Sequence, residues 1–288
     1  GSRGDVQPYT VLGKGLRAAG HQVRFITFES FEALITANGL DFHPIKGDAQ
    51  SLVAEAGANM LALLRKFSEL AASYADDLSV AQLKDTDIII NQLPLALYGY
   101  DLAEKFDVPL IMAAVMPLMP TRVFPMMGFP RWRLPGYNRL SYRAAISLIW
   151  LLYRPIINRW RKETLQLRPA RRRGYFDQLG TARFPVINGF SSIVVPRPID
   201  WSNHIHISGY WFPEDEAWQP PDDLRAFIES GSQPIFIGFG SMPVRDPQRT
   251  TQIIIDAIKR TGQRAILHAG WGNIGQHDLP QNIFKIDY

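Results

Sequence analysis

Short apolar runs alternate with amphipathic stretches along the first part of the chain. Gln22–Phe28 is rich in β-branched and aromatic residues, while Asp87–Asn91 and Val108–Val115 are almost continuously apolar. Runs of this length are typical of strands buried on both faces of a parallel sheet. Between them lie helical stretches such as Pro8–Ala19, which Pro8 should open and Gly20 should close. This alternation predicts a doubly wound α/β fold.

The alternation stops after Val115 and returns near the end of the first domain. A loop rich in Pro, Met and Phe comes first, and it suits either an apolar acceptor pocket or a plain core. A helical region then runs from Tyr137 to about Leu167. Three short strands are predicted after it, at Pro185–Asn188, Ser192–Val195 and His204–Ser208.

An acidic, Pro-rich stretch, Trp211–Asp223, is typical of a linker. We therefore predict a first domain over 1–210, a linker over 211–223 and a partial second domain over 224–288. The second domain should hold these helices and strands: Leu224–Glu229, Pro234–Phe239, Pro247–Thr261, Arg264–His268 and Ile283–Ile286.

The totals suit a globular chain of roughly two domains. The 288 residues contain no cysteine, which excludes a disulfide framework and favours a reducing compartment, so we expect a cytoplasmic protein. No apolar run reaches the roughly 18–20 residues of a membrane-spanning helix. The first residue is Gly1, at a point where a strand should just have ended, so we expect a trimmed N-terminus.

The opening stretch, Gly1-Ser2-Arg3-Gly4-Asp5-Val6-Gln7-Pro8, carries the strongest functional signal. Two glycines flank a predicted turn that leads into a helix N-terminus, where backbone N–H groups and the helix dipole attract anions. In open α/β sheets this is the edge at which ligands bind. The chemistry of Asp5 alone fits two roles, a helix N-cap or a group that works in the site.

Several segments carry a resemblance to a known family. They are GSRGDVQP, the following AAGH and VRFIT, Gly209-Tyr210-Trp211 before the linker, and PIFIGFGSM at 234–242. In this order they resemble sterol 3β-glucosyltransferases, and they are similar to the related antibiotic glycosyltransferases. The resemblance is to members of the UDP-glycosyltransferase family (glycosyltransferase family 1, or family 28 for the N-terminal domain). The resemblance implies the GT-B fold, two Rossmann-like doubly wound domains, of which the C-terminal one is incomplete here.

The resemblance also implies an inverting hexosyltransferase. It would move a hexose, expected to be glucose, from a UDP-sugar to the hydroxyl of a sterol-like or lipophilic acceptor. The family's base falls on Asp5, and the turn beside it is made by Ser2, Arg3 and Gly4. We expect no metal, because an electropositive loop and helix end can stabilise the leaving group in this fold. We expect no cofactor either, since the UDP-sugar is a donor substrate.

The donor side of the implied site lies in the second domain. Gly240 and Ser241 follow a strand and should approach the diphosphate. His268 and Trp271 end the next strand and should line the donor cleft, although packing accounts equally well for Trp271. The chain ends before the family's His- and Gly-rich loop, so we expect these 288 residues alone to be inactive.

Thirteen Lys and Arg side chains and one acid, Glu163, lie between Arg122 and Arg173, interleaved with Trp and Tyr. Such a segment suits peripheral contact with an anionic membrane through 122–173, or a solvated helical face. We do not expect nucleic acid as a partner, since the rest of the chain is net acidic.

Two other functions stay open at this point. One is a transferase of the same fold that uses a deoxysugar nucleotide and a polyketide or peptide aglycone. The other is a non-catalytic lipid-binding or membrane-surface module.

Overall fold

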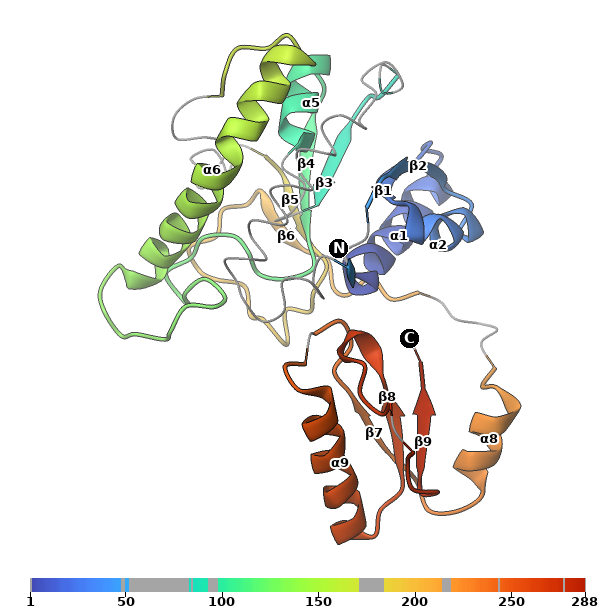
Figure 1. The fold of residues 1–288 in the computed structure, drawn as a ribbon. Coiled ribbons are helices and arrows are strands. Elements are labelled where there is room, and N and C mark those ends of the chain that lie inside the picture. Colours follow the sequence, from blue (N-terminus) through green and yellow to red (C-terminus); the bar gives the residue numbers. More distant parts are fainter. Residues whose placement is uncertain are drawn as a thin grey trace. The chain divides into compact units, whose positions relative to one another are not determined.

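The computed structural model describes residues 2–47, 50–51, 83, 85–92, 98–170, 184–213, 219–242, 244–276 and 278–287. These divide into two compact units (Figure 1). One holds Arg3–Gly47 and the described residues from 83 to 213, and the other holds those from 219 onwards together with residues 2, 50 and 51. The sequence also predicts a mostly helical stretch over Ser51–Leu83. Most of this stretch, and the arginines at 171–173, lie outside the described residues. Each unit is a mixed α/β structure with parallel sheets, which confirms the predicted fold class.

The first unit opens with a small helix-and-sheet layer. Its elements are α1 (Arg3–Ala18), β1 (Arg24–Phe28), η1 (Glu29–Phe31), α2 (Glu32–Ala37) and β2 (Asp41–Ile45). Strands β1 and β2 pair in parallel. Val6, Ile35 and Leu40 are buried between helices and strands. A Cβ on Gly13 would lie 2.8 Å from the Phe25 ring, so only a glycine lets α1 come this close to β1.

A second sheet holds the core of this unit. Its strands are β3 (Ile89–Gln92), β4 (Leu110–Ala114), β5 (Val186–Asn188) and β6 (Ile205–Ile207), all parallel and in that order. Helix α5 (Tyr98–Phe106) joins β3 to β4. The described strands of the first unit thus form two sheets, where the pattern predicts one.

The strand predicted over Ser192–Val195 is wrong, because these residues form a turn. The Ser191 hydroxyl accepts the N–H of Ile193, and the Ser191 carbonyl accepts the N–H of Val195. Ile193 is 90% exposed. Serine hydroxyls often close local turns of this kind, and here that bonding outweighs the β propensity of the apolar residues.

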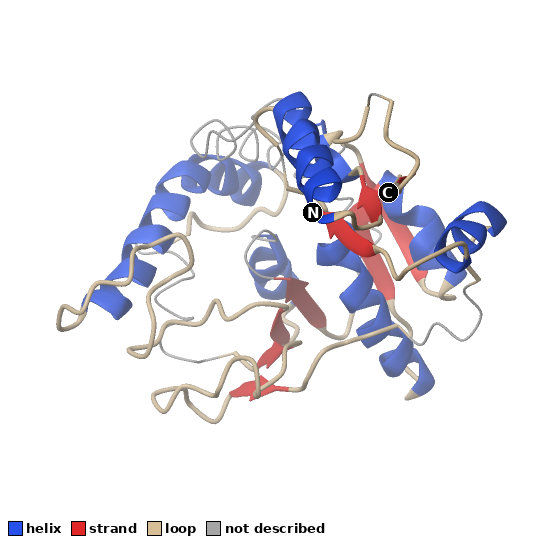
Figure 2. Cartoon of the chain, turned by 90° about the horizontal axis from the view of Figure 1, so that it is seen from below, coloured by secondary structure: helices blue, strands red, loops and turns tan. Residues whose placement is uncertain are grey.

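Residues 115–136 form a long connection without helix or strand, and α6 (Tyr137–Glu163) follows it (Figure 2). One stripe of α6 is buried and aromatic, with Tyr142, Trp150, Tyr153 and Trp160. Trp160 packs edge-on against Tyr98 of α5, with ring centroids 4.8 Å apart. Within the described ranges, no helix is both long and apolar enough to span a bilayer.

A buried ion-pair cluster ties α6 to α5. Arg161 is 3% exposed, and its guanidinium donates to the carboxylate of fully buried Asp101. It also contacts both carboxylate oxygens of Glu104, at 2.9 and 3.0 Å, and its Nε donates to the Arg168 carbonyl at 2.7 Å. Bidentate bonding of this kind fixes position as well as charge.

The second unit contains α8 (Asp222–Glu229), β7 (Ile235–Gly238), α9 (Pro247–Thr261), β8 (Ala265–His268), η3 (Gly270–Gly272) and β9 (Ile283–Ile286). The strands are parallel in the order β7-β8-β9, and α9 packs Ile254, Ile255 and Ile258 on one face. Helix α9 has the predicted bounds. Asp246 caps it by accepting the Arg249 N–H at 2.9 Å, Pro247 occupies its first turn, and Gly262 ends it at φ +62°.

Candidate active site

The carboxyl ends of β3 to β6 lie along one edge of their sheet, because all four strands are parallel. The first turn of α1 reaches this edge, where the side chain of Gln92, the last residue of β3, donates to the Asp5 carbonyl at 2.9 Å. Asp5 is half-buried. The structure therefore places the predicted base at the sheet edge where α/β proteins bind ligands.

The predicted turn over Ser2, Arg3 and Gly4 is wrong, because α1 begins at Arg3 rather than at Pro8. Arg3 and Gly4 are its first two residues, and Ser2 directly precedes it. Pro8 lies inside the helix and leaves the Gly4 carbonyl without its helical N–H partner, which costs little so close to the helix end.

The new start of α1 also excludes the N-cap role for Asp5, which is the third helical residue. A carboxylate in the first turn still interacts favourably with the positive end of the helix dipole. The side chain of exposed Arg3 donates to Gln7 at 3.0 Å along the same helix.

Tyr9 lies one helical turn after Asp5 and anchors α1 to β4. Its hydroxyl donates to the Ala113 carbonyl at 3.1 Å in a buried contact. Burial raises the pKa of Tyr9 well above its usual value, and the negative charge of Asp5 raises it further. The Tyr9 hydroxyl therefore stays protonated and remains a hydrogen-bond donor. The effect on its pKa shows that the Asp5 carboxylate acts electrostatically at this edge of the sheet.

Trp211 completes this edge of the first unit. Its ring meets Tyr9 edge-on, at 5.4 Å between centroids and 71° between planes, and its indole N–H donates to the Ser208 hydroxyl at 2.9 Å. A Cβ on Gly189, just after β5, would lie 2.8 Å from this indole. The Trp211 indole therefore packs directly on the backbone just after β5.

The Met-rich loop contributes more to the core than to an open pocket. Leu118 and Met119 are buried in the cluster around β4 and β5, and Met116 and Met126 pack against that cluster. The sequence left open whether this loop lines an acceptor pocket or belongs to the core. These four side chains belong to the core.

The donor residues predicted in the second unit gather at the carboxyl edge of its sheet. Gly240 follows β7 at φ +58°, and its carbonyl accepts the Trp271 N–H at 2.9 Å. Ser241 comes next in the same turn. His268 ends β8, and its ring stacks on Phe236 at 6.1 Å. Exposed backbone in such a turn offers donors to an anion.

Two glycines bring the loops after β7 and β8 into backbone contact. A Cβ on Gly270 would lie 2.3 Å from the Gly240 carbonyl oxygen, and Gly270 itself has φ +56°. A side chain at position 270 would therefore force the two loops apart.

We expect Gly270→Ala to lower the free energy of unfolding by about 2–3 kcal/mol, through the clash and the positive φ together. The matched control is Gly262→Ala, because Gly262 has φ +62° but open space around its Cβ position. The control should cost about 1 kcal/mol, the backbone term alone. Denaturant unfolding followed by circular dichroism measures both, and equal losses would show that the close approach is not rigid.

The sequence pattern missed Gln92 and Tyr9 as parts of the site. Gln92 could have been noticed, since it is a polar residue directly after an apolar run. Tyr9 carries no such signal, because a tyrosine on an amphipathic helix is ordinary.

Comparison with known proteins identifies the N-terminal part. Residues 1–125 match the glycosyltransferase family 28 N-terminal domain. The chain is 35% identical to a sterol 3-beta-glucosyltransferase of Aspergillus clavatus over 99% of its length, and 34% identical to one of Arabidopsis thaliana over all of it. It spans only 22% of the fungal relative and 47% of the plant relative.

Solved structures share the architecture. The glycosyltransferase of kitacinnamycin superposes with a TM-score of 0.66 at 16% identity, over 99% of this chain and 68% of that one. Arabidopsis thaliana UGT89C1, complexed with UDP-L-rhamnose, gives 0.53 at 14% identity, over 99% and 66%. These likenesses show the fold. Residues 1–125 carry a glycosyltransferase family 28 N-terminal domain, and the chain has the fold of these solved glycosyltransferases.

Proposed function

We propose that the protein carrying this chain transfers glucose from UDP-glucose to the hydroxyl of a sterol, with inversion at the anomeric carbon. The observation that carries the proposal is the identity of 34–35% to sterol 3-beta-glucosyltransferases along essentially the whole chain. The position of Asp5 at the ligand-binding edge of the first sheet supports it.

In the proposed reaction the acceptor oxygen attacks the anomeric carbon. The new carbon–oxygen bond forms as the bond to the diphosphate breaks, and UDP leaves with that electron pair. The hydroxyl proton passes to the Asp5 carboxylate, the general base. Attack opposite the leaving group inverts the anomeric centre. Tyr9 and Gln92 act as positioning residues, because they fix the first turn of α1 on the sheet.

The second unit would meet the leaving diphosphate with the turn at Gly240 and Ser241. Backbone N–H groups and a hydroxyl stabilise growing negative charge without a metal or a cofactor. His268 and Trp271, at the end of β8 and just after it, would border the donor.

A product assay tests the proposal. Full-length protein is incubated with UDP-glucose and a sterol panel, product is detected by mass spectrometry, and its anomeric configuration is read by NMR. We expect a sterol β-glucoside from the α-linked donor. If product forms only from a polyketide aglycone and a deoxysugar nucleotide, the protein is instead a transferase of the same fold with that donor and acceptor. The absence of product from every donor and acceptor would contradict enzyme function.

A further inference from the structure

The loop before α6 and the N-terminal half of α6 expose an unusual set of large apolar side chains. Each is between 48% and 69% exposed, and together they define the loop–helix surface: Val123, Met127, Trp132, Leu134, Leu140, Leu148 and Leu151. Scattered exposed apolar residues are normal, whereas seven of them in one loop and the helix that follows it point to a site of interaction. None of these side chains belongs to the candidate active site.

The leucines lie on one stripe of the helix. Leu140, Leu148 and Leu151 follow the spacing of a single α-helical face, and exposed Arg143 lies beside that face, about one turn after Leu140. The opposite stripe holds the buried aromatic residues that pack on the domain. Helix α6 therefore has two apolar faces, one buried and one exposed. A surface helix ordinarily has a single apolar face, which packs on the core.

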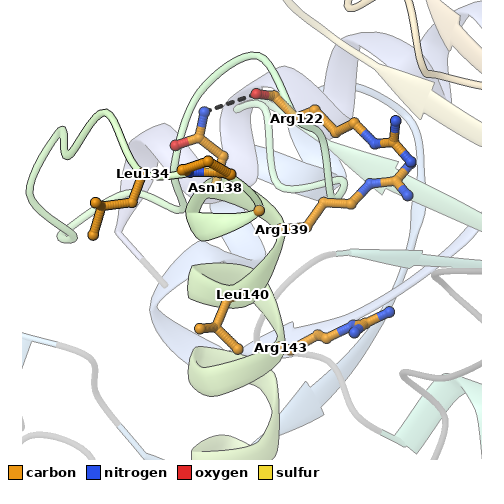
Figure 3. Close-up of a pocket in the computed structure, with 8 residues that line it drawn as sticks. Arg122, Leu134, Asn138, Arg139, Leu140 and Arg143 are labelled. Atoms are coloured by element: carbon orange, nitrogen blue, oxygen red, sulfur yellow. Dashed lines mark hydrogen bonds between the residues drawn. The ribbon is translucent and has the colours of Figure 1, made fainter.

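Positive charge accompanies the apolar residues. Arg122, Arg139 and Arg143 line a cavity of about 670 Å³ at the start of α6, together with Leu134 and Leu140. Figure 3 shows the three guanidinium groups on the same side of the helix. The sequence has no Asp or Glu from 108 to 162, so no acid within this segment offsets them.

One acid outside the segment faces this cluster. Asp200 accepts the Thr121 hydroxyl at 2.6 Å, the Arg122 N–H at 2.9 Å and the Arg139 guanidinium at 3.2 Å. These bonds outweigh burial and lower the pKa of Asp200, so it stays charged. Asp200 pairs with one of the three arginines, and its bonds fix the loop against α6.

We propose that the loop–helix surface docks on an anionic lipid bilayer. Arg122 and Arg143 bind lipid phosphates, and the leucines and Trp132 enter the boundary between head groups and acyl chains. This combination of arginines and exposed apolar side chains is characteristic of interfacial helices. A nucleic acid would use the charges but leave the leucines in water. The inference stands apart from the proposed reaction, although a lipophilic acceptor would be dissolved in the same bilayer.

Vesicle co-sedimentation of the full-length protein tests the proposal. Vesicles of phosphatidylcholine are compared with vesicles that also contain phosphatidylserine. We expect Arg122→Gln/Arg143→Gln and Leu148→Gln/Leu151→Gln each to weaken binding to the anionic vesicles at least about tenfold. Added salt should weaken wild-type binding, because exposed charges are screened.

Matched controls come from the second unit. Arg245→Gln/Arg260→Gln removes the same charge from exposed positions, and Ile253→Gln changes an apolar side chain that is 59% exposed on α9. Both should bind like wild type. Circular dichroism and unfolding midpoints verify that every variant is folded.

A second measurement reports insertion. Bromine-labelled acyl chains should quench the fluorescence of bound wild type more than that of Trp132→Phe, because Trp132 lies on the docking surface and is 58% exposed. Either of two results overturns the proposal: binding that ignores phosphatidylserine, or double variants that bind like wild type. A dimer that Leu148→Gln/Leu151→Gln dissociates, without vesicle binding, would assign the surface to a second copy of the chain. Glucosyl transfer to a detergent-solubilised sterol does not require a bilayer. It therefore tests the proposed reaction separately from membrane docking, and either proposal can fail while the other holds.

Discussion

Asp5→Asn should lower kcat/KM for glucosyl transfer by about 10²–10⁴-fold, the usual contribution of a positioned general base. The substitution preserves the shape of the side chain but removes its negative charge and its ability to take the acceptor proton. The bond from Gln92 goes to the backbone carbonyl of Asp5, so it survives the change. The first turn of α1 loses a favourable charge at its positive end, at a cost of about 0.3–1 kcal/mol.

The matched control is Glu32→Gln, which removes a carboxylate from the first turn of α2 at an exposed position. It should lose similar helix–dipole stabilisation and keep full activity. Initial rates over a range of sterol concentrations, and unfolding midpoints of both variants, complete the comparison. Equal rates for Asp5→Asn and wild type would place the base elsewhere and leave Asp5 with a helix-dipole role only.

Arg161→Ala should reduce the free energy of unfolding by about 3–5 kcal/mol, because it leaves a buried carboxylate without its counter-charge. Asp101 is fully buried and Arg161 is 3% exposed, so water does not readily replace the guanidinium. The same change removes the two bonds to Glu104 and the one to the Arg168 carbonyl.

Two further variants separate the causes. Arg159→Ala removes an exposed arginine from the same helix and should cost less than about 0.5 kcal/mol. Arg161→Met with Asp101→Leu replaces the buried charges by apolar groups and should recover much of the loss. Urea unfolding measures all three. A cost below about 1 kcal/mol for Arg161→Ala would show that the cluster is solvated in solution.

The sequence pattern predicted the parallel strands well where an apolar run is buried on both faces, as at β4, in which Leu110, Met112, Ala113 and Ala114 are all buried. It misplaced the start of α1 because Pro8 looks like a first helical residue, whereas a helix also tolerates proline a few residues further in. It wrongly predicted a strand at Ser192–Val195, because the β propensity of single residues does not include the hydrogen bonds by which Ser191 closes a turn.

The candidate site was only partly predictable. Asp5 and the turn at Gly240 follow from motifs that lie close together in sequence. The contact of Gln92 with Asp5 joins residues 87 positions apart, and that of Tyr9 with Ala113 joins residues 104 apart. Such pairs are set by the packing of α1 on the sheet edge, which a local pattern does not encode.

The contact between Gly240 and Gly270 limits how the proposed donor side of the site could be redesigned. Because a side chain at position 270 would strike the other loop's backbone, the two loops can be varied in chemistry but not in spacing. A mutant library should therefore randomise Ser241, His268 and Trp271 and hold both glycines constant. Variants that survive folding selection would then differ in what they bind rather than in whether the two loops still meet.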